Sequence, residues 1–190
     1  MSRTITRMSP QESDAWLALI ATAELLPAAL DAQLQRDAGI THYEFMVLTS
    51  LQQLGALRLG DLAAATNATL PRASKVVTRM QQRGLVERTT ASDDRRAIAI
   101  TLTGAGRRAL VLATPGHLET VRALVLDRLS PEQLWALSDA LEPVVATLDP
   151  HDRFSTRREN AAPRAAGHQI ETRSSGASHS ASASVTPNAS

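Results

Sequence analysis

The most constraining feature of the sequence is a pair of short helical segments joined by a four-residue turn. Residues 59–65 are rich in alanine and leucine, and residues 66–69 (TNAT) form a tight polar turn. Thr69 can cap the second helix, which runs to Arg83, and Gly84 supplies the left-handed residue that ends it. Two helices with so short a connection are typical of a helix-turn-helix.

A small β structure is predicted directly after this pair. Residues 85–88 lead into a polar, charged loop at residues 89–96, and residues 97–102 (AIAITL) alternate large and small apolar side chains. This period of two is that of a half-buried strand. Strand, charged loop and strand after a helix-turn-helix predict a winged helix.

Longer helices are predicted on both sides of this region. Apolar spacing and capping residues indicate helices over residues 11–36, 41–54, 103–129 and 130–148. Thr41 and Glu44 form a capping box at the start of the second of these helices. Residues 114–116 (TPG) offer a point where the third helix can break.

The domain organisation follows from composition. Residues 151–190 contain no leucine and only three large apolar residues, so they cannot bury enough surface to offset their ordering entropy. We therefore expect one domain over residues 1–150, with a DNA-binding lobe at about residues 41–102, and a disordered tail over residues 151–190. The fold class is mainly α with a small β wing.

The terminal helices carry long aliphatic faces that have too few partners within a chain of this size. Their apolar residues include Leu118, Val121, Leu124, Val125, Leu134, Leu137 and Leu141. A second copy of the chain can cover such a face, so we expect a helical dimerisation region beside the winged helix-turn-helix lobe.

Charge is concentrated in one part of the chain. Residues 69–108 hold nine basic and three acidic residues, whereas the rest of residues 1–150 holds six basic and thirteen acidic residues. A basic window inside an acidic body predicts a surface that binds a polyanion.

The second helix of the pair is amphipathic, with basic side chains on one face and apolar side chains on the other. On a helical wheel Arg72, Lys75, Arg79 and Arg83 fall on one narrow stripe, opposite Leu70, Ala73, Val77 and Met80, while Ser74 and Thr78 form a polar flank. No acidic residue of this helix compensates the stripe. Arginine and lysine side chains hydrogen-bond to guanine edges or to phosphates, and serine and threonine can bind either, so this helix is the predicted DNA-reading element.

The loop between the two strands adds a second cationic group. Arg95 and Arg96 lie at the tip of the hairpin, where they can enter a narrow minor groove of DNA. Asp94 can hold the Arg96 guanidinium in a fixed pose through a bidentate pair.

Several motifs resemble the MarR family of bacterial transcription regulators. DRRAIAITLTGAG at residues 94–106 looks like the wing and following helix start of that family, and it is the most specific of these motifs. Further similar stretches are ITHYEFMVL at 40–48, LGDLA at 59–63, SKVVTRM at 74–80 and RGLV at 83–86. The resemblance covers roughly residues 11–148.

The resemblance implies an obligate homodimer that binds double-stranded DNA at a pseudo-palindromic operator and acts mostly as a repressor. It implies that Thr69, Arg72, Ser74, Lys75 and Arg79 read the major groove, that Arg96 enters the minor groove beside Arg95, and that Asp94 orients Arg96. Members often bind a small aromatic ligand in a cleft between the dimer helices and the DNA lobe. Trp16, His42 and Tyr43 are the candidates for that site, although a core or surface role suits each of them equally well.

Other classes of function find little support in the residues. There is no cysteine, which excludes disulfides and thiolate chemistry, and no GxxxxGK[ST], HExxH or GxSxG motif. We therefore expect no enzyme, no cofactor and no metal. The N-terminus has no signal peptide, and Glu24 and Pro27 interrupt the longest apolar stretch, so we expect a cytoplasmic protein that does not cross a membrane.

Two alternatives remain open for the winged helix. It can bind DNA with low sequence specificity, or it can serve as a protein-interaction module.

Overall fold

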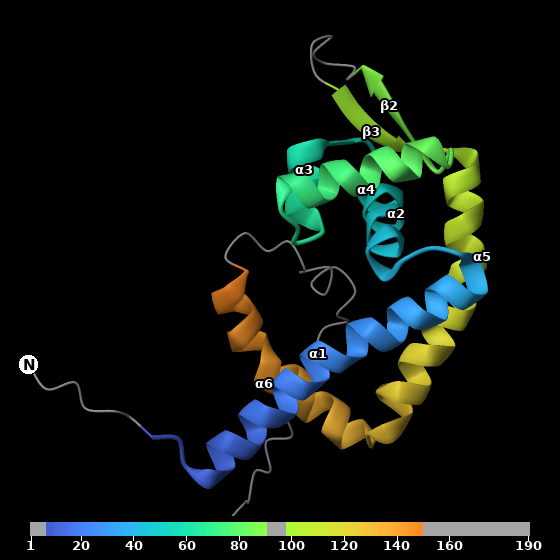
Figure 1. Cartoon of the computed structure of the whole chain (residues 1–190). Coiled ribbons are helices and arrows are strands. Elements are labelled where there is room, and N and C mark those ends of the chain that lie inside the picture. Colours follow the sequence, from blue (N-terminus) through green and yellow to red (C-terminus); the bar gives the residue numbers. More distant parts are fainter. Residues whose placement is uncertain (1–6, 91–97, 150–190) are drawn as a thin grey trace, which may run out of the picture. The chain divides into compact units, whose positions relative to one another are not determined.

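The computed structural model describes residues 7–90 and 98–149, all within one compact unit, Met1–Ser155 (Figure 1). The elements are α1 (Pro10–Ala38), α2 (His42–Leu54), β1 (Leu57–Arg58), α3 (Leu59–Ala65), α4 (Leu70–Gln82), β2 (Val86–Thr90), β3 (Ile98–Leu102), α5 (Gly104–Leu124), the short 3-10 helix η1 (Leu126–Arg128) and α6 (Pro131–Leu148). The predicted wing-tip residues Asp94, Arg95 and Arg96 and the predicted tail at 151–190 lie outside the described residues.

The helix-turn-helix is formed by α3 and α4. Asn67 adopts a left-handed conformation with φ 47° in the turn between them, and Gly84 does the same with φ 68° after α4. Thr69 occupies the N-cap position of α4 as predicted, but its side chain makes no capping hydrogen bond. The turn is stabilised instead by Thr66, whose hydroxyl donates to the carbonyl oxygen of Leu62 at 2.7 Å.

The wing is formed by strands β2 and β3, which belong to an antiparallel three-stranded sheet in the order β1-β3-β2. Val86 of β2 lies opposite Leu102 of β3, and Thr90 lies opposite Ile98. The predicted mainly α fold with a small β wing is therefore confirmed. Strand β1 was not predicted, because two residues carry no periodic signal and the strand exists only through its pairing with β3.

The predicted break in the third long helix is wrong. α5 continues through Pro115 to Leu124, because it packs along α1 at this point. A Cβ atom on Gly116 would lie 3.2 Å from side-chain atoms of Gln33 and Asp37 on α1, so glycine permits the close approach. This packing outweighs the backbone hydrogen bond that proline removes.

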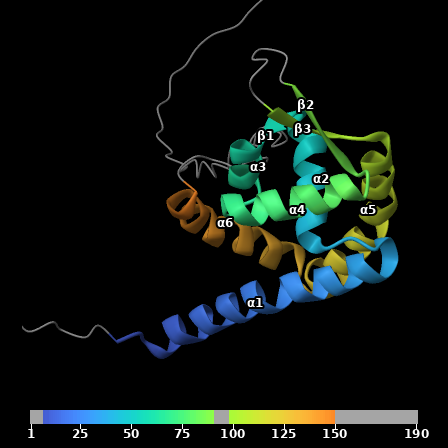
Figure 2. The same cartoon turned by 45° about the horizontal axis from the view of Figure 1, so that its top comes forward.

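The core lies where α2, α4 and the sheet meet, and Figures 1 and 2 show these elements gathered in one lobe with α3. Fully buried side chains there include Val47, Leu48, Leu62, Val77, Met80, Val86 and Ile100. Leu70, which the helical wheel placed on the apolar face of its helix, is 53% exposed, and Leu54 at the end of α2 is 61% exposed. Each lies at the terminus of its helix, where the packed face has already ended.

Outside this lobe much apolar surface is uncovered. No residue of α6 is buried, and Trp135 on this helix is 66% exposed. Trp16, Leu17 and Leu25 on α1 are exposed as well. By length and composition alone, Pro10–Ala38 and Gly104–Arg128 are apolar enough to cross a membrane.

Candidate nucleic-acid interface

Helix α4 buries one face and exposes the other. Ala73, Val77 and Met80 pack into the core of the lobe. Of the five residues predicted to read the major groove, Thr69, Arg72, Lys75 and Arg79 are exposed and Ser74 is half-buried. The fold therefore brings Arg72, Lys75 and Arg79 together along one outward face, with a spacing of three to four residues that matches the helical period, while Ser74 lies on the flank of this face.

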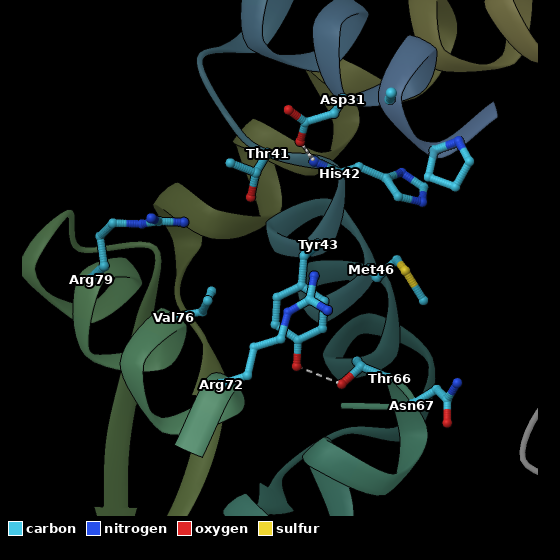
Figure 3. Close-up of a pocket in the computed structure, with 12 residues that line it drawn as sticks. Asp31, Thr41, His42, Tyr43, Met46, Thr66, Asn67, Arg72, Val76 and Arg79 are labelled. Carbon is cyan, nitrogen blue, oxygen red and sulfur yellow. Dashed lines mark hydrogen bonds between the residues drawn. The ribbon is translucent and has the colours of Figure 1, made fainter. Parts of the chain in front are cut away.

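Arg72 lies against an aromatic ring of α2. Its guanidinium carbon is 4.5 Å from the centre of the Tyr43 ring, a cation–π contact (Figure 3). Tyr43 is buried, and its hydroxyl is 2.8 Å from the hydroxyl of Thr66 in the helix-turn-helix turn. One tyrosine thus connects the guanidinium group of Arg72 to the turn that precedes α4.

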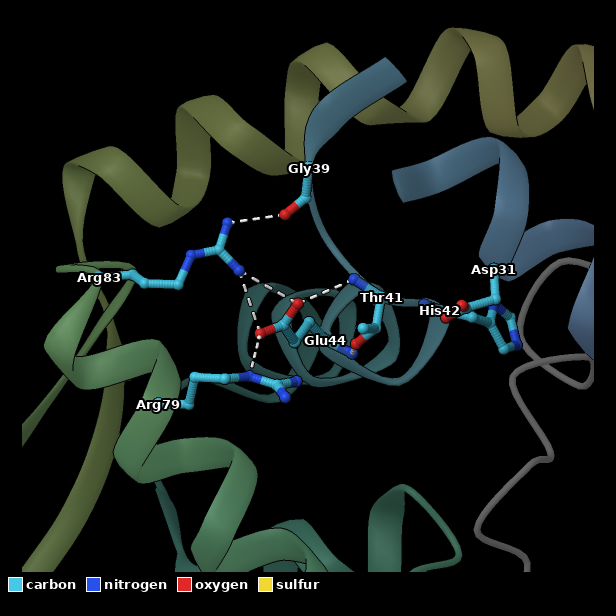
Figure 4. A network of polar contacts seen from close by, with 7 residues as sticks. All are labelled: Asp31, Gly39, Thr41, His42, Glu44, Arg79 and Arg83. Carbon is cyan, nitrogen blue, oxygen red and sulfur yellow. Dashed lines mark hydrogen bonds and ion pairs between the residues drawn. The ribbon is translucent and has the colours of Figure 1, made fainter. Parts of the chain in front are cut away.

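Arg79 and Arg83 have an acidic partner, which corrects the interpretation of the basic stripe as uncompensated. The partner is Glu44, which belongs to α2 rather than to α4 (Figure 4). The Nε atom of Arg79 donates to Glu44 Oε1 at 3.1 Å, and Nη1 of Arg83 donates to the same oxygen at 3.1 Å and to Oε2 at 3.2 Å. Arg83 also donates to the carbonyl oxygen of Gly39 at 2.8 Å.

A further cation beside α4 was not singled out from the sequence. Arg88 lies on β2, and its Nη2 donates to the hydroxyl of Thr78 at 3.4 Å. Its presence in the basic window was the available signal, but only the fold shows that the strand runs beside the exposed face of α4.

An open cleft of about 660 Å³ adjoins the helix (Figure 3). Its walls come from α1 (Pro27, Ala28, Asp31), the start of α2 (Thr41, His42, Tyr43, Met46), the turn (Thr66, Asn67) and α4 (Arg72, Val76, Arg79). Two of the three candidate ligand residues, His42 and Tyr43, line the cleft. Trp16 does not; it lies exposed near the N-terminal end of α1.

Two histidines meet where α2 faces α5. The rings of His42 and His117 have centroids 6.1 Å apart, and Phe45 lies 4.4 Å from the His117 ring. The Nδ1 atom of each histidine is buried without a hydrogen-bond partner within residues 7–90 and 98–149. Burial lowers the pKa of both imidazoles; Asp31 partly opposes this at His42, and the neighbouring His42 adds to it at His117.

A two-stranded wing after a helix-turn-helix whose second helix exposes a basic face defines a winged helix-turn-helix protein. The model of the MarR family matches residues 40–98. Sco3205 of Streptomyces coelicolor, a MarR family transcriptional regulator solved in complex with DNA, is 35% identical with a TM-score of 0.71. The match covers 77% of this chain and 96% of that one.

Two further relatives agree. The HTH-type transcriptional regulator YfiV of Bacillus subtilis, itself uncharacterised, is 30% identical over 107 residues, which are 56% of this chain and 66% of that protein. BpsR of Bordetella bronchiseptica, whose DNA binding is regulated by 6-hydroxynicotinic acid, is 26% identical with a TM-score of 0.54; the match covers 65% of this chain and 98% of that one. The chain belongs to the MarR family, whose members matched here are transcription regulators rather than enzymes.

Proposed function

We propose that this protein is a homodimeric repressor that binds a pseudo-palindromic DNA operator and is released by a small-molecule ligand. The observation that carries the proposal is the exposed face of α4, where Arg72, Lys75 and Arg79 stand away from the core. The relative Sco3205, which is 35% identical, was solved in complex with DNA, and this supports DNA as the partner of the present chain.

DNA recognition is divided between two elements in this proposal. Helix α4 enters the major groove, where Thr69, Arg72, Ser74, Lys75 and Arg79 meet base edges and phosphates. The wing residues Arg95 and Arg96 enter the adjacent minor groove, with Asp94 as the residue that orients Arg96. These three wing residues are proposed on the sequence motif alone.

The uncovered apolar surface supports the dimer. Leu118 and Leu124 on α5, Trp135 and Leu137 on α6 and Trp16 on α1 are all exposed in one chain. Exposed large apolar side chains on three helices indicate an interaction surface, and a symmetric second copy offers a matching one. The same interface accounts for the apolar character of α1 and α5 without a membrane, in keeping with a cytoplasmic protein.

The cleft beside α4 is the proposed ligand site. It offers a guanidinium at Arg72, an imidazole at His42 and the ring of Tyr43, a set that suits a small aromatic acid. The regulation of BpsR by 6-hydroxynicotinic acid is in line with this chemistry. Because the cleft touches both α1 and α4, an occupant can alter how α4 is held.

The test is a titration of the protein against its own upstream DNA and a scrambled duplex at two salt concentrations. Tight and selective binding by a dimer is the expected result. Equal binding to both duplexes would indicate a DNA binder of low specificity, and no binding even at low salt would indicate a protein-interaction module.

A further inference from the structure

Glu44 is the most deeply buried carboxylate among the described residues of the DNA-binding lobe, with 1% of its side chain exposed. Sequence alone explains only half of its contacts. Its Oε2 atom accepts the backbone N–H of Thr41 at 2.8 Å, which completes the capping box of α2. Its Oε1 atom accepts from Arg79 of α4 and from Arg83, the C-cap residue of that helix, and these contacts have no part in capping (Figure 4).

A capping box does not need a charge at this position, because glutamine satisfies it as well as glutamate. A buried carboxylate is costly unless it is paired and hydrogen-bonded. The negative charge is therefore accounted for by the two guanidinium groups rather than by the cap.

The two arginines are four residues apart, so they leave α4 on the same side one turn apart. Two anchored points on one side of a helix fix its rotation about its own axis. Side-chain tips lie about 5–6 Å from the axis, so a rotation of about 20° would move them by about 2 Å. A displacement of that size breaks hydrogen bonds to base edges.

The same contacts join α4 to the end of α1. Arg83 donates from Nη2 to the carbonyl oxygen of Gly39, the residue that terminates α1, while its Nη1 contacts Glu44 at the start of α2. Arg79 pairs through Nε, so Glu44 does not hold the two Nη groups that form the outer fork of the guanidinium.

We propose that Glu44 is a positioning residue that sets operator specificity: through Arg79 and Arg83 it fixes the rotation of α4 and the pose of the Arg79 side chain. This inference rests on the proposed function. We call the ion pairs of Glu44 with Arg79 and Arg83 the clamp. In this inference Arg83 belongs to the clamp and does not contact DNA.

The test is Glu44→Gln, which keeps the capping box and removes the charge. We expect the ratio of operator affinity to scrambled-duplex affinity to fall about tenfold, the discrimination of one good base contact, while scrambled-duplex affinity stays the same or rises slightly. Glu12→Gln is the matched control, because Glu12 forms the same capping box with Ser9 at the start of α1. A ratio within twofold of wild type for Glu44→Gln would overturn the inference.

A second variant covers the case in which Glu44→Gln does not fold. Arg83→Gln removes one arm of the clamp from a partly exposed site and leaves the Arg79–Glu44 pair in place. It is expected to lower the affinity ratio in the same direction, and an unchanged ratio counts against the clamp.

A readout without DNA separates this inference from the proposed function. In the free protein, the NMR signal of the Arg79 Nε–H group should shift in both Arg83→Gln and Glu44→Gln and should exchange faster with water in Glu44→Gln, whereas Glu12→Gln should leave it unchanged. If both substitutions change the Arg79 signal in this way but the wild-type protein does not discriminate between the two duplexes, the proposed function alone is refuted. If the Arg79 signal is unchanged in both variants, the proposed role of Glu44 in positioning Arg79 is refuted.

Discussion

Arg72 and Arg79 leave the same face of α4 two turns apart and reach neighbouring residues of α2. Arg72 lies over the ring of Tyr43, whereas Arg79 is held by the carboxylate of Glu44. The helical wheel predicted the exposed face on which both lie. It did not predict the partners, because Glu44 is 35 residues away from Arg79 and 39 from Arg83, and such contacts exist only after folding.

Substitution of Arg72 by alanine should relax sequence preference. We expect the affinity for the operator to fall about tenfold or more, with a smaller loss on a scrambled duplex, because a guanidinium fork that reads a base edge carries sequence information. Arg72→Lys is the control that keeps the charge and loses the fork. Arg96→Ala is expected to weaken binding with less effect on preference. Equal losses on both duplexes for Arg72→Ala would place this side chain on a phosphate instead.

The histidine pair makes stability depend on pH. Burial lowers the pKa of His42 and His117 below their ordinary value of 6.5, so the unfolded chain binds protons at these sites before the folded chain does. This contribution to the free energy of unfolding is complete above about pH 6.5 and is lost as the pH falls below it. Thermal unfolding at a series of pH values between about 7.5 and 5 measures the effect.

The substitution His117→Gln isolates this contribution. The drop in melting temperature on acidification should be smaller for the variant than for wild type, because the unfolded variant has one imidazole fewer that binds a proton more readily than the folded protein does. Parallel curves for the two proteins would assign the pH dependence to other groups.

Among the elements, helices with capping residues were the most predictable. Thr41 and Glu44 begin α2, and Ser130 and Gln133 begin α6, as their sequence patterns indicate. Local hydrogen bonds within four residues specify these starts. The two errors of element assignment, β1 and the break at Pro115, both depend on packing against a segment distant in the chain.

Gly106, in the first turn of α5, is required by the packing of that helix on the segment after α4. A Cβ atom added there would collide with the carbonyl oxygen of Leu85, which is backbone and cannot move aside. Gly106→Ala should therefore cost about 2–4 kcal/mol of stability in urea unfolding. At Gly104 the nearest atom to an added Cβ is Arg108 Nη1 at 3.6 Å, so Gly104→Ala should be neutral or slightly stabilising. Equal stability of the two variants would contradict the close approach.

At the scale of the whole molecule, composition predicted that the terminal helices would lack partners, and the exposed faces of α1 and α6 agree with this. Which residues lie in a shared interface does not follow from the sequence, since apolar periodicity gives a face but not its partner. The cleft cannot be predicted from the sequence either, because its walls come from α1, α2 and α4 and meet only in the folded chain.

Leu137→Glu on α6 should shift the protein toward monomer and remove operator binding, because the charge would be buried in the proposed interface. Analytical ultracentrifugation over a dilution series measures the state of association. Leu54→Glu is the matched control: this leucine is also exposed, at the end of α2 in the lobe, and its substitution should leave the dimer intact. A Leu137→Glu variant that sediments like wild type would contradict the placement of α6 in the interface.

The clamp formed by Glu44, Arg79 and Arg83, with the carbonyl oxygen of Gly39 that also accepts from Arg83, determines which substitutions can change operator preference. A chimera that receives only the outward-facing residues of a relative's recognition helix would keep this clamp. It would therefore keep the rotation of the present α4 about its own axis. A chimera that receives the entire helix without arginines at positions 79 and 83 would leave Glu44 as an unmatched buried charge. The transfer of operator preference from one relative to another should therefore succeed when the residue at position 44 is transferred together with the helix.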